Sequence, residues 1–251
     1  KSAAIRLCGR TVKEAKALAA AFGKKAKKYA MVMKIGRTHL QDAVPMTYGQ
    51  SFAAYARAIE KDVTELEGSL KGIEEIGVGG TAVGSGITAH PRFRERVVQR
   101  IREEGGIGAR PSKDGFEITQ DMNDLLAVSS ALRRYAVTLG RIANDLRLLA
   151  SGPKAGIAEL ALPEVEPGSS IMPGKVNPSI PEAVNMACFQ VIGNDYAVLL
   201  AAQSGQLELN FATPLIAYGV FQSAELLSNC SDMLRRLCVE GLGVDEKRAE
   251  E

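Results

Sequence analysis

The sequence predicts an all-α protein built as a bundle of long helices. Apolar residues recur at alternating spacings of three and four over long stretches, which is the seam of a helix that packs against other helices. The strict alternation of apolar and polar residues that would indicate a sheet is missing. Segments rich in Gly, Pro and hydroxyl residues separate the helical stretches, so the chain divides into a scaffold and its connecting loops.

The helical elements can be followed in order along the chain. An Ala-rich helix is expected over residues 1–29. The next seam comprises Phe52, Ala56, Ile59, Val63, Leu66, Leu70 and Ile73. A second seam comprises Ile118, Met122, Leu125, Leu132, Tyr135, Leu139, Ile142, Leu146 and Leu149. A further helix is expected from near Pro181, a residue tolerated in a first turn, to about Gly205. The last seam comprises Ile216, Val220, Leu227, Cys230, Leu234 and Leu237.

These helices are expected to be unusually long. At least two approach about 30 residues, far above the globular mean of about 11, and helices of this length with regular seams are typical of bundles. The chain has 251 residues, enough for one large domain or two small ones with a core.

Composition and charge exclude several classes of function. Hydrophobic residues make up 46% and charged residues 24%, and the net charge of +2 is spread along the chain, which gives nucleic-acid binding little support. The basic cluster Lys24, Lys25, Lys27 and Lys28 is interpreted as a solvated helix face. No apolar run reaches the roughly 18 residues that a bilayer span requires, and no signal peptide opens the chain, so no membrane partner is expected.

The cysteines and histidines indicate neither disulfides nor a metal site. The four cysteines, Cys8, Cys188, Cys230 and Cys238, have no paired short spacing, which is typical of reduced thiols in a cytoplasmic protein. Two scattered histidines and four scattered cysteines give no zinc-ligand spacing. We therefore expect no metal and no cofactor.

The loop over residues 151–180 is the most informative candidate site. Its residues 168–178 read Gly-Ser-Ser-Ile-Met-Pro-Gly-Lys-Val-Asn-Pro and combine two hydroxyls, one ammonium and one carboxamide. Lys175 and Asn177 are suited to hold a carboxylate, and the Gly-Ser-Ser turn is suited to present backbone N–H groups to an anion. The alternative is a structural loop that closes two helices and leaves Lys175 in solvent.

Two other loops carry candidate residues. Residues 36–46 place His39 among polar groups, where it is either a functional or a surface histidine. Residues 77–86 contain a formal GxGxxA match to a dinucleotide-binding turn. The match follows a long helix rather than a strand, so that interpretation fails on its context.

Taken together, the three loops resemble the fumarase/aspartase superfamily. The resemblance rests on GRTHLQDAVPM at residues 36–46, GGTAVGSG at residues 79–86 and GSSIMPGKVNP at residues 168–178, and it covers nearly all of the chain. It implies the family's central helical domain over residues 1–241 and the start of a truncated C-terminal domain over residues 242–251. The N-terminal domain, with a further substrate-binding segment, is expected to be absent from this chain.

The resemblance also implies roles for individual residues. Ser169 matches a catalytic base on a mobile loop, and Glu182 matches an acid that pairs with the histidine at position 39. Residues matching substrate contacts are Thr38, His39, Lys175 and Asn177. Gly168, Ser170 and Met172 belong to the supporting loop. Family members are homotetramers whose central domains join into one helical core and whose active sites collect loops from three subunits.

The implied activity is a lyase reaction that releases fumarate from a succinate-like acid. Residues 177–185 and 202–210 resemble the aspartase branch, which favours L-aspartate as substrate, with (S)-malate and fumarate as the alternative. In either case, proton abstraction next to a carboxylate would give an aci-carboxylate that cations and hydrogen-bond donors stabilise. A third alternative, of another class, is a catalytically silent helical fragment that lacks part of the site.

Overall fold

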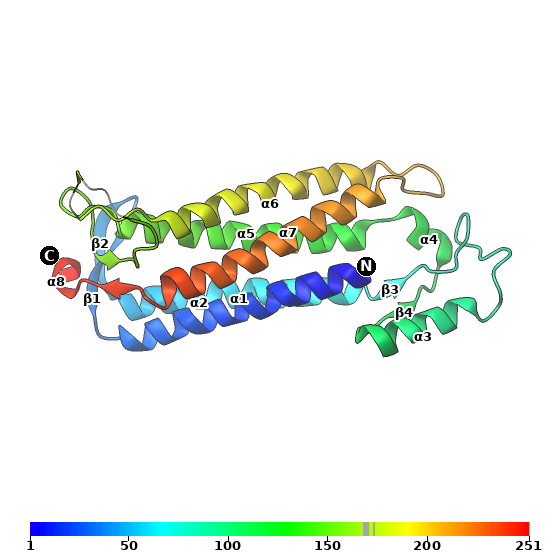
Figure 1. The fold of residues 1–251 in the computed structure, drawn as a ribbon, viewed down its shortest axis with the longest axis horizontal. Coiled ribbons are helices and arrows are strands. Elements are labelled where there is room, and N and C mark those ends of the chain that lie inside the picture. Colours follow the sequence, from blue (N-terminus) through cyan, green and yellow to red (C-terminus); the bar gives the residue numbers. More distant parts are fainter. Residues whose placement is uncertain (168–170, 173, 251) are drawn as a thin grey trace. The chain divides into compact units, whose positions relative to one another are not determined.

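The computed structural model describes residues 1–250 except residues 168–170 and 173. Five long helices dominate the described residues: α1 (Ser2–Lys28), α2 (Tyr48–Gly72), α5 (Asn123–Leu149), α6 (Ser179–Gln203) and α7 (Thr213–Leu234) (Figure 1). α1 and α5 have 27 residues each, which corresponds to a length of about 40 Å. The predicted mainly helical fold is thereby confirmed.

The chain forms two compact units, and each long helix contributes a segment to both of them. Unit 1 consists of Lys1–Val12, Thr64–Arg134 and Gln190–Leu227. Unit 2 consists of Lys13–Val63, Tyr135–Phe189 and Ser228–Glu251. The loops of residues 32–48 and 151–180 belong to unit 2, whereas the glycine-rich loop of residues 77–90 belongs to unit 1.

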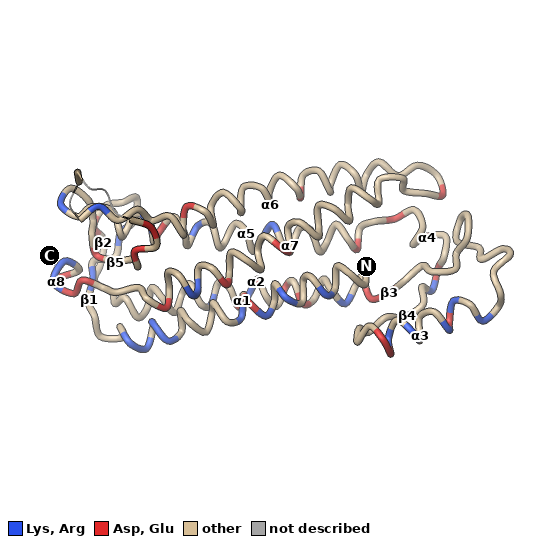
Figure 2. Tube along the Cα trace, viewed as in Figure 1, with Lys and Arg blue, Asp and Glu red and all other residues tan. Residues whose placement is uncertain are grey.

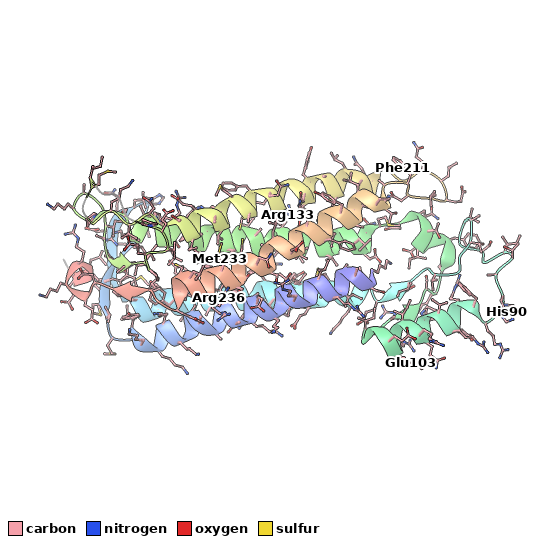
Figure 3. The ribbon with its side chains drawn as sticks, viewed as in Figure 1. His90, Glu103, Arg133, Phe211, Met233 and Arg236 are labelled. Carbon is pink, nitrogen blue, oxygen red and sulfur yellow. The ribbon has the colours of Figure 1, made fainter. Side chains whose placement is uncertain are left out.

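Polar side chains join the helices inside unit 1. The buried Asp195 of α6 accepts a hydrogen bond from Ser129 of α5 at 2.7 Å. It also forms an ion pair at 3.0 Å with Arg133, which is labelled in Figure 3. The neighbouring Asn194 donates to Ser223 of α7 at 3.1 Å. Because a polar group buried without a partner is destabilising, these bonds fix which helix faces meet.

An aromatic cluster occupies the core of unit 2. The ring of Phe22 on α1 lies 6.3 Å from that of Phe52 and 5.6 Å from that of Tyr55, both on α2. Tyr135 of α5 shares a 2.6 Å hydrogen bond with Ser231 of α7. These aromatic side chains are almost completely buried, and their packing holds the end of the bundle that carries the hairpin and its neighbouring loop.

Basic residues gather at the end of α1 (Figure 2), and their burial differs in part from the expected solvated face. Lys24, Lys27 and Lys28 are exposed, but Lys25 is buried and its Nζ donates to the carbonyl oxygen of Leu242 at 2.6 Å. The position of Lys25 on the helix brings its side chain against the segment that follows α7. The charge pattern alone carried no information about this partner.

α6 exposes a row of large apolar side chains along its length: Met186, Phe189, Ile192, Tyr196, Leu199 and Leu200. By length and composition, α6 alone among the described helices is apolar enough to cross a bilayer, contrary to the expectation from the sequence, and 39% of its apolar window is buried. A helix from the core of a helical protein passes the same test. The exposed row is an unpartnered surface within the described residues.

The shorter elements connect the long helices. β1 (Met33–Thr38) pairs antiparallel with β2 (Gln41–Thr47), β3 (Glu75–Ile76) pairs parallel with β4 (Arg110–Pro111), and β5 (Leu160–Ala161) pairs antiparallel with β6 (Gly243–Val244). The remaining short helices are α3 (Phe93–Gly105), α4 (Gly115–Gln120), the π-helical turn η1 (Arg235–Val239) and α8 (Glu246–Glu250).

Two helical predictions require correction. The seam that was expected to run unbroken from Ile118 is divided between α4 and α5, because Asp121 is extended and its carboxylate caps the N–H of Asn123 at 2.6 Å. The last seam continues beyond the end of α7 into η1, so Leu237 lies in a π-helical turn. The helix α3 was not predicted at all.

Candidate active site

The loop of residues 32–48 is a β-hairpin rather than an irregular segment. β1 and β2 pair in one register from Met33 to Ile35, and the register shifts by one residue before Arg37, which marks a β-bulge. Gly36 lies at this shift. A Cβ there would be 2.9 Å from the carbonyl oxygen of Val44, so a larger residue would force the strands apart.

The turn of this hairpin presents two of the predicted site residues. Thr38 pairs with Gln41, so the turn consists of His39 and Leu40. Both have positive φ, +56° and +60°, as in the type I′ turn that matches the twist of a two-residue hairpin. The left-handed conformation costs L-residues about 1–2 kcal/mol each, so this turn is strained. Thr38, His39 and Leu40 are all exposed.

A buried carboxylate lies at the base of the hairpin. Glu159 is 1% exposed, and its Oε1 accepts from Arg37 Nη2 at 2.5 Å while its Oε2 accepts from the Tyr48 hydroxyl at 2.5 Å. Lys34 Nζ lies 3.9 Å from Oε2 and 4.6 Å from the centre of the Tyr48 ring. The Glu159 side chain, from the segment before β5, thus contacts residues of β1 and of the start of α2.

The pKa shifts in this cluster follow from burial and hydrogen bonding. The hydrogen bond to Glu159 raises the pKa of Arg37. Burial, and then the bond to Glu159, raises the pKa of the Tyr48 hydroxyl, which therefore remains a donor. Burial lowers the pKa of Lys34, and the nearby Glu159 opposes that shift.

The described part of the loop before α6 exposes the predicted carboxylate-binding groups. Lys175 and Asn177 are exposed, and the Asn177 amide donates to Glu166 at 3.0 Å. Ser179, the first residue of α6, donates to the same oxygen at 2.6 Å. These two bonds lower the pKa of Glu166, the bond from Ser179 being the larger cause.

Three of the predicted site residues, Gly168, Ser169 and Ser170, lie outside the described residues. Met172 is described and half-exposed. The assignments of Ser169 as base and of its neighbours as a supporting loop therefore stay predictions.

Glu182 lies in the first turn of α6 and bonds to a residue other than the expected histidine. Its Oε1 accepts from Arg147 Nη2 of α5 at 3.4 Å. Within the described residues, no hydrogen bond links Glu182 to His39. Because the resemblance assigns each active site to several subunits, this arrangement inside one chain does not test the predicted pair, which stays a prediction.

The glycine-rich loop belongs to unit 1. The carbonyl oxygen of Gly80 accepts from the N–H groups of Gly84 and Gly86, each at 3.0 Å. The loop follows the two-residue strand β3, contrary to the expectation that a helix precedes it directly, but it opens no helix of its own. The next helix, α3, begins beyond His90 (Figure 3), so the dinucleotide-binding interpretation still fails on its context.

Gly84 of the glycine-rich loop lies directly against Gly115 of α4, and neither position has room for a side chain. Gly84 has φ +105°, and a Cβ on it would lie 2.0 Å from the carbonyl oxygen of Gly115 at the start of α4. A Cβ on Gly115 would likewise lie 2.1 Å from the carbonyl oxygen of Gly84. Backbone packs directly on backbone at this point, which holds the loop against α4.

The four thiols are free and buried, as expected for reduced cysteines. Burial raises the pKa of Cys8, Cys188 and Cys238 to about 12 and that of Cys230 to about 11. Thiols held in this way are protonated and inert at neutral pH. Within the described residues, no group of three or more His, Cys, Asp or Glu side chains is arranged to hold a metal ion.

The cluster of Glu159, Arg37 and Tyr48 was not predicted from the sequence. A signal was present, because Glu159 is the single charged residue in the stretch Ile-Ala-Glu-Leu-Ala-Leu of residues 157–162. A lone carboxylate in an apolar segment is seldom buried without a cationic or hydroxyl partner. Its partners lie more than 100 residues earlier in the chain, so spacing gives no clue to their identity.

Comparison with known proteins places this arrangement among lyases. A family model described as "Lyase" matches residues 3–193. The chain is 49% identical over 232 residues to the aspartate ammonia-lyase of Helicobacter pylori, covering 92% of this chain and 50% of that protein. It is 42% identical over 241 residues to the class II fumarate hydratase of Neisseria meningitidis, covering 96% of this chain and 52% of that protein.

Solved structures of two other proteins share this fold. A Brucella melitensis protein described as a fumarate lyase:delta crystallin bound to cobalt superposes with a TM-score of 0.95 at 45% identity, covering 99% of this chain and 54% of that one. A class II fumarase from Schistosoma mansoni superposes with a TM-score of 0.94 at 32% identity, covering 99% of this chain and 56% of that one.

Proposed function

The chain belongs to the lyase family whose model matches its residues 3–193, and we propose that the enzyme containing it eliminates ammonia from L-aspartate to give fumarate. The chain spans about half the length of the relatives that it matches, since it covers 50% of the Helicobacter pylori protein. The activity is therefore proposed for the full-length enzyme. We also propose that residues 1–241 are its central helical domain and residues 242–251 the start of a C-terminal domain.

The observation that carries this proposal is the likeness to relatives named aspartate ammonia-lyase. The first of these are 48–50% identical over 92% of the chain, from Helicobacter pylori and from Pseudomonas species. The exposed Thr38 and His39 of the hairpin turn, and the exposed Lys175 and Asn177 before α6, supply hydroxyl, imidazole, ammonium and carboxamide groups suited to a dicarboxylate.

The proposed chemistry begins with removal of a proton from the carbon next to a substrate carboxylate. Ser169, as its alkoxide, accepts this proton and becomes a neutral hydroxyl, and the electron pair of the C–H bond moves into the carboxylate to form a dianionic aci-carboxylate. Lys175 and Asn177 donate to that carboxylate, where the negative charge develops. The electrons then return to form the carbon–carbon double bond, the C–N bond breaks, and ammonia and fumarate leave.

Fumarate hydration is the competing function, because the Neisseria meningitidis relative named fumarate hydratase is 42% identical over 96% of the chain. Hydration of fumarate to malate uses the same intermediate with water in place of ammonia. Absorbance at 240 nm, where fumarate absorbs, separates the two when the full-length enzyme receives L-aspartate or L-malate. A rise with L-malate alone would refute the ammonia-lyase proposal.

The 251-residue chain by itself is proposed to have little or no activity. These 251 residues cover 50% of the Helicobacter pylori relative, so half of an enzyme of that length, with any substrate contacts it carries, lies outside them. The chain alone would then be a helical scaffold that holds some of the substrate contacts. Turnover by the purified chain at the rate of the full-length enzyme would contradict this.

The exposed row on α6 supports a proposed homotetramer with active sites shared between subunits. In unit 1 the row includes Tyr196, which is 64% exposed, and Tyr218 of α7 is 61% exposed. Apolar surface of this extent is expected to be covered by a partner, and long helices of a second copy fit such a row. We further propose a cytoplasmic location, in keeping with the reduced thiols.

A further inference from the structure

Glu159 is positioned between the two loops that carry the proposed substrate contacts. It lies directly before β5, and the chain continues from β5 towards Lys175 and Asn177. Its carboxylate bonds to Arg37, the residue next to Thr38 and His39 of the hairpin turn. We propose that Glu159 is a positioning residue that fixes the hairpin turn relative to the segment leading into the substrate loop. This inference rests on the proposed lyase function.

The contacts of Glu159 make it a rigid junction. Both carboxylate oxygens are occupied, one by Arg37 and one by Tyr48, and the side chain is 1% exposed. Charge-assisted hydrogen bonds with short donor–acceptor distances resist changes of geometry more strongly than neutral ones. The main chain of the same residue is fixed too, because its carbonyl oxygen accepts from the N–H of Asp245 at 2.9 Å.

The hairpin needs an anchor of this kind. Its strands share no wider sheet, the register shifts at Gly36, and the turn at His39 and Leu40 is strained by two positive φ angles. An isolated two-stranded hairpin is marginally stable in water, so an exposed turn at its tip would sample many positions. α8 lies against β1, and the bond between Arg37 and Glu159 holds the strand one residue before the turn (Figure 1).

The substitution Glu159→Gln in the full-length enzyme tests the junction. A carboxamide has the same size but no charge. The bond to Arg37 therefore loses its charge assistance and the attraction to Lys34 disappears, even where the Tyr48 hydroxyl accepts from the new NH2 group. The matched control is Asp145→Asn, because Asp145 of α5 is also held by a tyrosine, Tyr55, and an arginine, Arg141, each at 3.0 Å. Within the described part of the chain, Asp145 makes no hydrogen bond or ion pair to the hairpin.

We expect Glu159→Gln to lower kcat about 10- to 100-fold with a smaller change in KM, since a misplacement of about 1 Å in a substrate contact reduces the rate by that order. Asp145→Asn is expected to change kcat less than about 3-fold, within the range usual for substitutions away from a site. A double-mutant cycle with His39→Ala gives a further readout. If Glu159 acts through the turn, its substitution has little additional effect once His39 is removed.

Amide hydrogen exchange of residues 38–41 measures the anchoring without any reaction. Faster exchange of these amides in Glu159→Gln, but not in Asp145→Asn, is the expected result. The proposal would be overturned if Glu159→Gln left the exchange of these amides unchanged. It would also be overturned if Glu159→Gln lowered kcat by the same factor in the wild-type enzyme and in His39→Ala. If the wild-type enzyme forms fumarate from neither L-aspartate nor L-malate, the proposed function fails, while the exchange measurement still decides the role of Glu159.

Discussion

Replacement of Gly84 by alanine is expected to detach the glycine-rich loop from α4. The new Cβ would lie 2.0 Å from the carbonyl oxygen and 2.2 Å from the carbonyl carbon of Gly115, and these are backbone atoms that cannot rotate away. Overpacking of this kind costs about 1–3 kcal/mol. The φ of +105° adds strain of about 1–3 kcal/mol for an L-residue. The free energy of unfolding should therefore fall by about 2–6 kcal/mol.

Gly106→Ala is the matched control for this prediction. Gly106 is the C-cap residue that follows α3 and has φ +62°. A Cβ there would meet nothing within 4 Å. Alanine at that position is left with conformational strain alone, about 1 kcal/mol. The difference between the two variants isolates the contact with Gly115.

Urea denaturation of the full-length enzyme, followed by far-UV circular dichroism, gives the change in the free energy of unfolding for both variants. Hydrogen exchange of residues 115–120 should show whether α4 opens locally before the rest of the chain unfolds. The close contact would be refuted as the cause if Gly84→Ala destabilised the enzyme no more than Gly106→Ala.

Three further predictions concern the thiols, the proposed interface and the proposed base. The raised pKa of Cys8, about 12 in the folded chain, means that an unfolded thiol ionises first as the pH rises above about 9, so stability falls by about 1.4 kcal/mol per pH unit per thiol. Urea midpoints between pH 8 and pH 11 should show a decline that is shallower in Cys8→Ala. Tyr196→Glu, on the exposed row of α6, should shift light-scattering masses from tetramer towards smaller species at equal concentration, and an unchanged mass would argue against this face as the interface. Ser169→Ala should abolish fumarate formation while leaving the assembly intact, and surviving activity would show that another group is the base.

The long helices could be predicted from the sequence because their periodicity is repeated many times. The seam of α2 from Phe52 to Leu70 repeats the same spacing through several turns, so one irregular residue does not obscure it. α3 lacks this redundancy. Its buried residue is Val98, and the apolar group of Val97, Val98 and Ile101 is too short to reveal a periodic pattern.

The hairpin could not be predicted because its strands violate the usual signals. β2 contains Pro45, which disfavours a strand, and most of its residues are exposed. β1 alternates in burial, but its buried positions are Lys34 and Gly36, neither of which is apolar enough to reveal the pattern. Lys34 is buried beside Glu159, which lies far along the chain. The residues next to Lys34 in the sequence therefore give no sign that it is buried.

The candidate site could be predicted where its residues form contiguous motifs. The substrate contacts Thr38, His39, Lys175 and Asn177 stay predictions, which could be made because the resemblance matches one contiguous motif to another. The partners of these residues are scattered instead: Asn177 bonds to Glu166, and Glu182 bonds to Arg147 of α5. Contacts between distant segments depend on tertiary packing, which no local pattern encodes.

The two left-handed residues of the hairpin turn bear on any attempt to engineer a more heat-resistant enzyme. Stability-based selection favours Asn-Gly in a two-residue turn, because those residues adopt positive φ with little strain. A library scored on thermal survival alone would therefore drift away from His39 and Leu40 and discard the imidazole together with the strain. Holding position 39 fixed while allowing Gly at position 40 would recover part of that stability and keep the side chain for which the turn is proposed to exist.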